Sequence, residues 1–289
     1  MKKIFSILLS ICLLFLCSCS SVDSNSTFEI TFIDVGQGDS ALIECDGQYM
    51  LIDGGDEAAQ NKVYTTLEEK GVKRLEILAI SHLHEDHYAG LIKALSYAQK
   101  EKLTISNKTY VENKTFGELE RQLQINGSKI KVPHVGDKFK LGSAEVEVVD
   151  VSAEKNNDSL VLLITYGNTR FLFTGDIEDE AQTRISDKYQ NESDEPFEID
   201  LIKMPHHGSA SKHSADGTGS LYRFIRTFKS ESKPQYAIIS VGKGNKYGHP
   251  SDKTLKLLED AKFIIYRTDL HGDILVRSDG ETLSIETSR

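Results

Sequence analysis

The stretch Ser81-His82-Leu83-His84-Glu85-Asp86-His87 decides the fold and the chemistry expected of this chain. It follows the apolar run ILAI (77–80), which is typical of a buried strand, and precedes a pattern that predicts a helix from about Tyr88. The histidines supply neutral nitrogen ligands and Asp86 a hard oxygen ligand, a mixture suited to zinc, manganese or iron. A lone histidine is more often structural, but this density at a strand end predicts a metal site.

Strand and helix patterns surround this stretch. The first half-chain has strand-like runs at 28–35, 40–45, 48–55 and 75–82, with a helical pattern at 57–70. The second half-chain opens with strand-like runs at 144–150, 159–166 and 170–176 and then alternates helix with strand. The halves therefore predict an α/β fold, two sheets packed face to face with helices outside. The segment 101–136, with a helical pattern around 116–124, is interpreted as an insertion or rim element.

The N-terminus has the pattern of a secretory signal, a short positive stretch followed by an apolar run and small residues. The boundary from Leu16 to Cys19 resembles the lipobox of bacterial lipoproteins, which implies lipidation at Cys19 and an anchor on the extracytoplasmic face of the cell membrane. Ordinary signal cleavage is the alternative. We expect a signal peptide over 1–18, a polar tether over 19–27 and one hydrolase domain over 28–289.

Composition limits the classes of function. With 39% hydrophobic residues the chain can bury a core, and its net charge of −10 argues against a broad surface that neutralises phosphates. A metal site reverses the field locally, so an anionic substrate remains open. Cleavage before Cys19 leaves Cys45 alone in the mature domain, where the alternating run SALIEC predicts a buried or half-buried strand residue.

The motif His82-x-His84-x-Asp86-His87 resembles the metal-binding motif of the metallo-β-lactamase superfamily. The resemblance spans nearly the whole mature chain and implies a four-layer αββα sandwich, hydrolase activity and two divalent metal ions, zinc or manganese. Asp176 in FLFTGD resembles the carboxylate that bridges the two metals. Asp53 in LIDGG resembles the acidic residue that orients the histidine loop, with a simple turn aspartate as the alternative.

The paired histidines of Pro205-His206-His207-Gly208-Ser209 follow another apolar run, DLIKM. By analogy with phosphorylcholine esterases of the superfamily, His207 is the expected metal ligand and His206 the residue that faces the phosphate. The reverse order and a loop-capping role remain open. The resemblance thus implies one set of metal ligands: His82, His84, Asp86, His87, Asp176 and His207.

A narrower resemblance rests on the order of six segments, DVGQGDS, LIDGG, NNDSLVL, FTGD, MPHHGS and NKYGHPS. Together they resemble the metallohydrolase domain of ComEC-type competence proteins. Those proteins carry membrane-spanning helices beside this domain, so the chain resembles a stand-alone, lipid-anchored relative. One departure is Asn156-Asn157-Asp158-Ser159, where most superfamily hydrolases place another histidine ligand. Asp158 is a candidate oxygen ligand there, with a structural turn residue as the alternative.

The late loop 242–250 combines glycines with polar side chains before a helix expected to begin near Ser251. Its backbone N–H groups suit an anion, and Asn245, Tyr247 and His249 are candidate substrate-binding residues. A helix entry with Ser251 as N-cap is the simpler interpretation and is compatible with the first.

Two cations would activate a water, so no protein nucleophile is required, and the sequence contains neither a G-x-S-x-G elbow nor a P-loop. Asp86, His206 and His249 are the candidate catalytic residues. We expect a phosphodiesterase of ComEC-like type with DNA as a candidate partner. The alternatives are a hydrolase of a phosphorylcholine ester, lactone or β-lactam, and a metal-bearing accessory lipoprotein without turnover. No protein partner follows from the sequence.

Overall fold

The computed structural model describes residues 26–153, 158–192, 197–210 and 219–289. The predicted signal peptide, the proposed lipidation site Cys19 and most of the tether lie outside the described residues.

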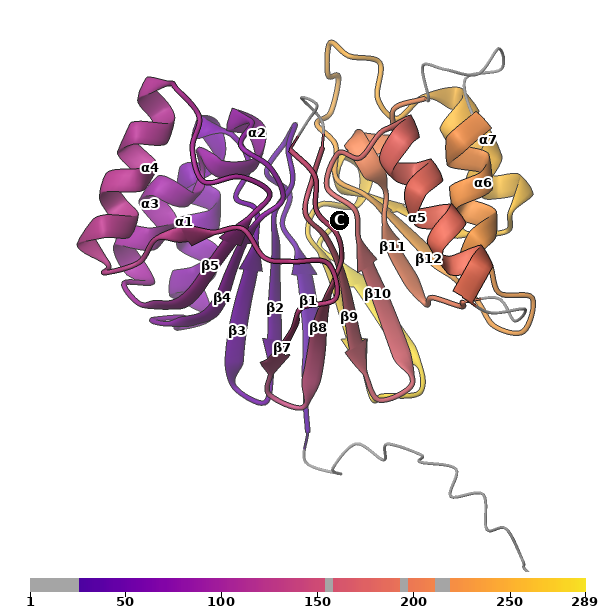
Figure 1. Ribbon diagram of the computed structural model, residues 1–289, viewed down its shortest axis with the longest axis horizontal. Helices are drawn as coiled ribbons and strands as arrows, with labels where there is room; N and C mark the ends of the chain where they lie inside the picture. The colour runs from indigo at the N-terminus through magenta and orange to yellow at the C-terminus, as the bar shows by residue number, and fades with distance from the viewer. Residues whose placement is uncertain (1–25, 154–157, 193–196, 211–218) are drawn as a thin grey trace, which may run out of the picture.

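Two sheets form the centre of the molecule (Figure 1). The first sheet has eight strands in the order β15-β14-β1-β2-β3-β4-β5-β6. Its strands are β1 (Phe28–Phe32), β2 (Ala41–Cys45), β3 (Gln48–Ile52), β4 (Leu75–Ile80), β5 (Glu101–Ser106), β6 (Ile130–Lys131), β14 (Ile274–Ser278) and β15 (Leu283–Thr287). The strands from β3 to β6 run parallel to one another, so their carboxyl ends share one edge.

The second sheet has seven strands in the order β13-β12-β11-β10-β9-β8-β7. Its strands are β7 (Lys138–Leu141), β8 (Ala144–Asp150), β9 (Val161–Tyr166), β10 (Thr169–Phe173), β11 (Leu201–Lys203), β12 (Tyr236–Ile239) and β13 (Ile264–Arg267). The meander β7 to β10 is antiparallel, and β10 to β13 are parallel. Each half thus combines an antiparallel part with a parallel part.

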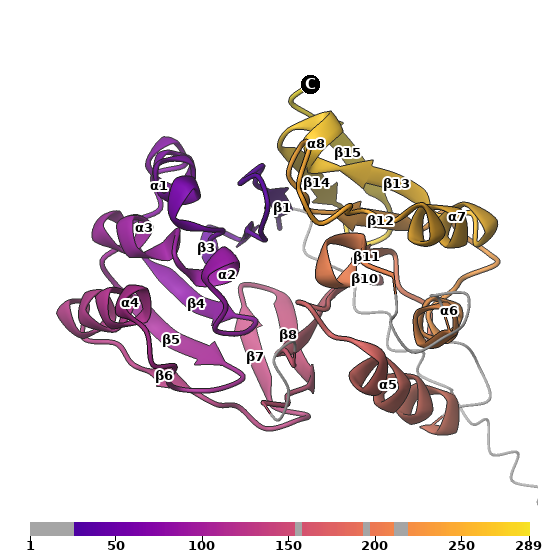
Figure 2. The same ribbon diagram turned by 90° about the horizontal axis from the view of Figure 1, so that it is seen from above.

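Helices cover the outer face of each sheet (Figures 1 and 2). The first half has η1 (Glu57–Ala59), α1 (Gln60–Glu69), α2 (Glu85–Tyr88), α3 (Leu91–Tyr97) and α4 (Lys114–Ile125). The second half has α5 (Asp179–Glu192), η2 (Pro205–Gly208), α6 (Gly219–Thr227), α7 (Asp252–Asp260) and α8 (Thr268–His271). One apolar core lies between the sheets and one lies under each helical layer. The four-layer αββα sandwich is confirmed.

Two parts of the chain differ from the sequence-based prediction. Residues 101–106 are not a rim insertion. They form β5, a strand of the first sheet that pairs in parallel with β4. Thr104, Ile105 and Ser106 are buried there, which an exposed rim element would not allow. The C-terminal hairpin of β14 and β15 was not predicted, and it crosses to the first sheet by pairing with β1. Its strands have five residues each, and the pairing of β14 with β1 joins the two ends of the described chain.

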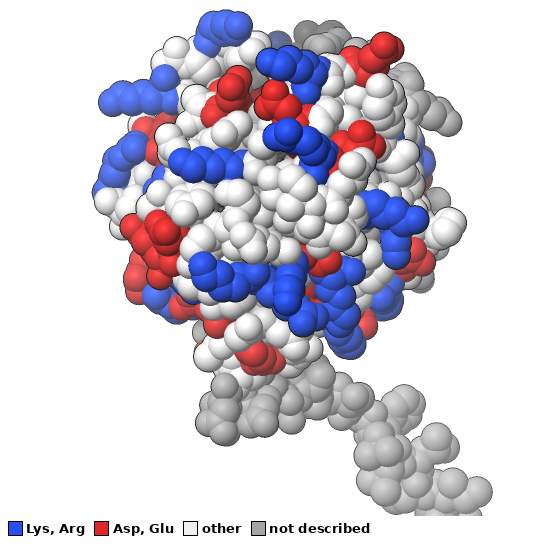
Figure 3. Space-filling model, turned by 90° about the vertical axis from the view of Figure 1, so that its left-hand side faces the viewer, with Lys and Arg blue, Asp and Glu red and all other residues white. Residues whose placement is uncertain are grey.

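Charge is mixed on the outer face of the first helical layer. Figure 3 shows basic and acidic side chains interspersed around a central area that has neither. This face is therefore not the broad basic surface that nonspecific nucleic-acid binding requires, which agrees with the net charge of −10.

Candidate metal centre

The histidine stretch leaves the first sheet at the end of β4. The strand is buried along its length apart from Glu76, and His82 follows it with 1% exposure. His84 keeps extended backbone at the N-cap of α2, so the chain turns sharply and places the fully buried His87 one turn later. The helix therefore begins at Glu85, earlier than the predicted start near Tyr88.

Asp53 holds this turn in place from the neighbouring strand end. Its Oδ1 accepts a hydrogen bond from the Ser81 backbone N–H at 2.7 Å, and its Oδ2 accepts one from the Ser81 hydroxyl at 2.7 Å. Oδ2 also lies 2.9 Å from His87 Nδ1. These contacts have the geometry that the predicted orienting role of Asp53 requires.

Glycines let the chain approach α2 closely enough for this arrangement. A Cβ on Gly90 would lie 1.8 Å from the carbonyl oxygen of Gly54, and a Cβ on Gly38 would lie 2.4 Å from that of Asp86. A hydrogen bond holds the two segments together, since the Gly54 N–H donates to the His87 carbonyl at 2.6 Å. The segments DVGQGDS and LIDGG thus pack against the histidine turn because they carry glycine there.

The second half supplies its residues from two adjacent parallel strand ends. Asp176 follows β10, and the His206–His207 pair follows β11, whose Lys203 is in register with Phe173 of β10. Both histidines have left-handed backbone, with φ of 47° and 54°, inside the η2 turn. The turn directs His207 inward, where it is 2% exposed, and leaves His206 partly exposed.

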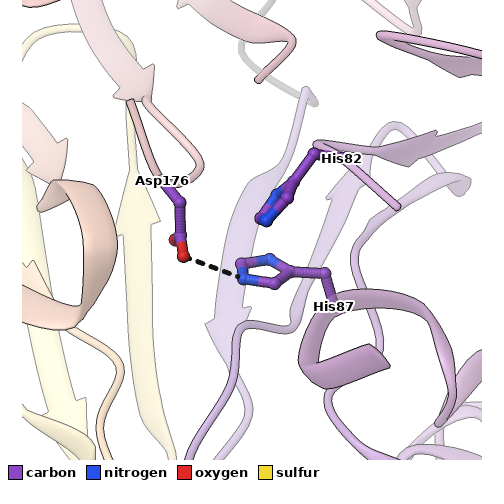
Figure 4. A group of neighbouring side chains, drawn as sticks. All are labelled: His82, His87 and Asp176. Atoms are coloured by element: carbon purple, nitrogen blue, oxygen red, sulfur yellow. Dashed lines mark ion pairs between the residues drawn. The ribbon is translucent and has the colours of Figure 1, made fainter. Parts of the chain in front are cut away.

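Four overlapping groups of possible ligand atoms lie among the described residues, with all ligand atoms of a group within 4.8 Å of one another. One group joins His82, His87 and Asp176, and another joins Asp86, His87 and His207. The other two contain Asp39, with Asp176 and His207 or with Asp53 and His87. Figure 4 shows the first group, in which His87 Nε2 lies 3.4 Å from Asp176 Oδ2. His207 Nε2 lies 3.6 Å from Asp86 Oδ2 and 3.7 Å from Asp176 Oδ2.

The donor atoms of these groups fit a cation. Among the described residues, His87 Nε2, His207 Nε2 and Asp176 Oδ1 are buried and have no hydrogen-bond partner. Buried polar atoms in proteins are nearly always satisfied, and nitrogen and carboxylate oxygen are the donors that zinc and manganese take. His84 lies beside this set, with Nδ1 2.9 Å from His82 Nε2, and it is only half-buried.

The electrostatics of the site also favour positive charge at this position. Burial alone lowers the pKa of His207, but the Asp176 and Asp39 carboxylates outweigh it and raise that pKa to about 9. Burial likewise opposes a charge on His87, yet Asp176 and Asp53 hold its pKa well above the usual value. Protons on these imidazoles therefore balance the buried carboxylates where cations would otherwise do so.

Asp39 and Lys203 are site residues that the sequence analysis missed. The Lys203 ammonium is 4% exposed and forms an ion pair with Asp39 Oδ2, while Asp39 Oδ1 lies 3.3 Å from His207 Nδ1. Asp39 Oδ2 is also 3.9 Å from His87 Nδ1. The available signal was a lysine inside the buried strand DLIKM, because a lysine is almost never fully buried without a partner.

Asp158 does not join any of these groups of ligand atoms. Its Oδ2 accepts a hydrogen bond from the Ser152 hydroxyl at 2.6 Å, and its carbonyl oxygen accepts one from Asn107 Nδ2 at 2.6 Å. The neighbouring Ser159 faces the site instead, since its Oγ accepts a hydrogen bond from the Asp176 N–H at 2.9 Å and lies 3.5 Å from His82 Nδ1. The oxygen-ligand role expected of Asp158 therefore has no geometric support.

The loop 242–250 forms the rim of the site on the side of the second sheet. The His249 ring lies 5.5 Å from the His206 ring, and the exposed Tyr247 ring stacks 5.9 Å from His249. Asn245 serves the loop itself: its amide nitrogen donates to Gly242 and His249 carbonyls, and its oxygen accepts from the Tyr247 and His249 N–H groups. We therefore retain Tyr247 and His249, but not Asn245, as substrate candidates.

Three further expectations concern a cysteine, a helix cap and membrane-spanning helices. Cys45 is a buried free cysteine in β2, as predicted. Ser251 caps α7 by accepting the Thr254 N–H at 3.2 Å. Within the described part of the chain, none of the helices has the length and apolar character needed to cross a bilayer.

Known proteins share both the sequence pattern and the fold. The chain is 28% identical over 287 residues to ComE operon protein 3 of Bacillus subtilis, covering 92% of this chain and 34% of that protein. It is 27% identical over 273 residues to Recombination protein 2 of Haemophilus influenzae, covering 92% of this chain and 31% of that protein. The chain thus spans about a third of the length of these curated relatives.

Solved structures agree at the level of the fold. The metallo-beta-lactamase fold protein YhfI of Bacillus subtilis matches with a TM-score of 0.56 at 15% identity, covering 88% of this chain and all (100%) of that chain. CmlA, a diiron beta-hydroxylase of Streptomyces venezuelae, matches with a TM-score of 0.56 at 16% identity, covering 89% of this chain and 55% of that one. Residues 33–217 match the metallo-beta-lactamase superfamily, whose members are generally metal-dependent hydrolases, and the chain belongs to that superfamily.

Proposed function

We propose that this protein is a metal-dependent phosphodiesterase that cleaves nucleic acid. The observation that carries the proposal is the overlap of the first two ligand groups, which share His87 and contain unpartnered buried atoms directed at one volume. Bound divalent cations, zinc or manganese, would supply Lewis acidity and lower the pKa of a coordinated water. One cation would be held by His82, Asp176 and the half-buried His84. The other cation would be held by Asp86, His87 and His207.

His206 and the residues around it suit phosphoryl chemistry. His206 Nδ1 lies 3.1 Å from Glu178 Oε1, and its Nε2 lies 3.8 Å from Asp176 Oδ2. The carboxylate of Glu178 fixes the His206 ring, which leaves its other nitrogen directed toward the site. His206, with His249 beside it, is therefore placed to donate a hydrogen bond to a phosphoryl oxygen as charge develops there.

Similarity to ComE operon protein 3 and to Recombination protein 2 supports nucleic acid as the substrate class. The test uses purified residues 20–289 loaded with manganese or zinc. We expect cleavage of single- or double-stranded DNA and of bis-p-nitrophenyl phosphate, with metal content near two ions per chain by elemental analysis. His84→Ala should reduce both, whereas His134→Ala, a surface histidine whose side chain is 91% exposed, should reduce neither.

Assays of the same purified protein with other substrates distinguish the competing reactions. Hydrolysis of nitrocefin or a lactone, with every phosphodiester left intact, would overturn the phosphodiesterase proposal in favour of another ester or amide substrate. Metal binding without turnover of any substrate would favour the accessory role.

We also propose that a lipid on Cys19 anchors the protein to the extracytoplasmic face of the membrane. The lipobox-like Leu16–Cys19 boundary supports this proposal. Radiolabelled palmitate should enter the full-length protein and not the Cys19→Ala variant, which should be recovered in the soluble fraction. Equal labelling of both would contradict the anchor at this residue.

A further inference from the structure

Strand register places Lys108 beside the histidine stretch. β4 and β5 are parallel neighbours, with Ile80 opposite Ser106. Each strand runs directly into a loop, so Lys108 follows Ser106 at the same distance along the chain as His82 follows Ile80. The carboxyl ends of parallel strands meet at one edge, the edge at which α2 lies (Figure 1). Asn107 fixes the loop by donating to the carbonyl oxygens of Ser152 and Asp158, at 2.9 and 2.6 Å.

Lys108 is only partly buried at the end of β5, so its ammonium group is within reach of solvent and substrate. Lys108 forms no ion pair with any residue that the structure describes. An ammonium group with no ion-pair partner at the edge of a cation site attracts an anion that binds to the cations. A phosphate of the substrate is such an anion.

An exposed aromatic ring follows in the same loop. Tyr110 is 59% exposed, and its ring packs edge-on against Phe116 at 5.7 Å and 87°. Phe116 in turn packs edge-on against Tyr88, the residue after His87. This chain of rings holds Tyr110 against the part of the molecule that carries the histidine turn while leaving much of its ring accessible. Nucleic-acid bases stack on such rings without preference for one base.

We propose that Lys108 and Tyr110 form a subsite for the nucleotide next to the scissile phosphodiester, with Lys108 binding its phosphate and Tyr110 stacking on its base. The inference rests on the proposed phosphodiesterase function and extends it to a single-stranded substrate, because a paired base is not free to stack on a side chain. The subsite lies on the first-sheet rim, and Tyr247 and His249 lie on the rim of the second-sheet half.

The kinetic test compares substrates with and without the flanking nucleotide. Lys108→Gln should lower kcat/KM for a ten-nucleotide oligothymidylate about tenfold, mainly through KM, and leave bis-p-nitrophenyl phosphate hydrolysis unchanged. Tyr110→Ala should have a similar effect that Tyr110→Phe does not, and an oligonucleotide with abasic flanking positions should be insensitive to Tyr110→Ala. Lys129→Gln is the matched control, since Lys129 is exposed and precedes Ile130, which is in register with Thr104 of β5, away from the carboxyl ends of the parallel strands.

A binding measurement separates this inference from catalysis. By fluorescence anisotropy of a labelled phosphorothioate oligothymidylate, Lys108→Gln should weaken binding and reduce the salt slope of log K by roughly 0.7, the value for one phosphate on a single strand. Active wild-type protein with unchanged cleavage and binding in both variants would overturn the subsite alone. Equal loss on bis-p-nitrophenyl phosphate would assign Lys108 to the reacting phosphate and also overturn it. A wild-type protein that cleaves no phosphodiester would overturn the proposed function together with this inference.

Discussion

The underside and the open side of the metal centre are built differently. On the underside, Asp39, Asp53 and Lys203 are at most 6% exposed and bind each other, the histidine turn or His207. On the open side, His206 is partly exposed and Tyr247 is 58% exposed, and their neighbours are other rings and the loop 242–250.

The difference assigns different roles to the two regions. Buried, mutually bonded charges determine geometry, and losing one partner leaves an uncompensated charge that destabilises the fold. Partly exposed rings contribute little to folding and are free to contact a substrate. Substitutions on the underside should therefore affect stability and metal content, and those on the open side should affect turnover in a protein that folds normally.

Asp176 lies between the two regions, and we expect its loss to have the largest effect. Asp176→Asn removes a carboxylate charge that faces His82, His87 and His207 together. Phosphodiesterase activity should fall roughly a thousandfold and metal content should drop. Steady-state kinetics and elemental analysis check this, with Asp260→Asn, at an exposed residue of α7, as the control. Retained activity with full metal content would contradict the assignment.

The underside is tested most directly at Lys203. Lys203→Met leaves the buried Asp39 carboxylate without its cation, and the free energy of unfolding should fall by about 3–5 kcal/mol. Urea titration measures this. The double variant Lys203→Met with Asp39→Asn should recover part of the loss, because the uncompensated charge is then removed. The exposed pair of Lys256 with Asp260 is the control, where Lys256→Met should cost about 0.5 kcal/mol or less. A wild-type midpoint for Lys203→Met would contradict the stabilising role.

Sequence reasoning identified the open-side residues and the candidate ligands more readily than the underside. The candidate ligands follow apolar strands closely, so both their chemistry and their position at a strand end are visible in the order of residues, as with His82 and Asp176. Asp39 gives no such signal, since its partners His207 and Lys203 are distant in sequence and only the packing of the two halves joins them.

The same limit applies to the fold. Alternating patterns revealed the strands of both halves, and the register of the parallel strands then determined where their ends meet. The pairing of β14 with β1 could not be inferred, because it joins residues about 250 positions apart, such as Glu29 and Arg277, across the whole domain. The sequence left two roles open for Asp158 for a related reason: a turn aspartate can bond within its own loop, here to Ser152, or reach a site, and sequence alone does not distinguish the two.

A pH titration sharpens the contrast between metal-free and metal-loaded protein. His207 has its pKa raised from 6.5 to about 9 in the metal-free fold, so its contribution to stability is fully present below about pH 6.5 and is lost as the pH rises through about 9. The metal-free free energy of unfolding should fall by on the order of 3 kcal/mol over that window. Cations bind the neutral imidazole, so the gap in Tm between metal-loaded and EDTA-treated protein should widen with pH. A gap that narrows would contradict this linkage.

On the open side, His206→Ala should lower kcat roughly 10- to 100-fold, because it removes a donor placed for a developing phosphoryl charge. The unfolding midpoint in urea should stay at the wild-type value, since His206 is partly exposed and not among the groups of ligand atoms. A large loss of stability or of metal would instead place His206 with the underside residues.

Glu178 should show the smallest effect, because it acts through His206. Glu178→Gln keeps a hydrogen-bond acceptor near His206 Nδ1, now 3.1 Å from the carboxylate, but removes the charge that favours one orientation of the His206 ring. We expect kcat to fall by less than about tenfold, with KM little changed. In the double variant Glu178→Gln with His206→Ala, the Glu178 substitution should add almost nothing to the loss from His206→Ala, since a positioning residue has no effect once the group it positions is absent. Additive losses would mean that Glu178 contacts the substrate directly, and the open side would then include an acidic contact as well as imidazoles.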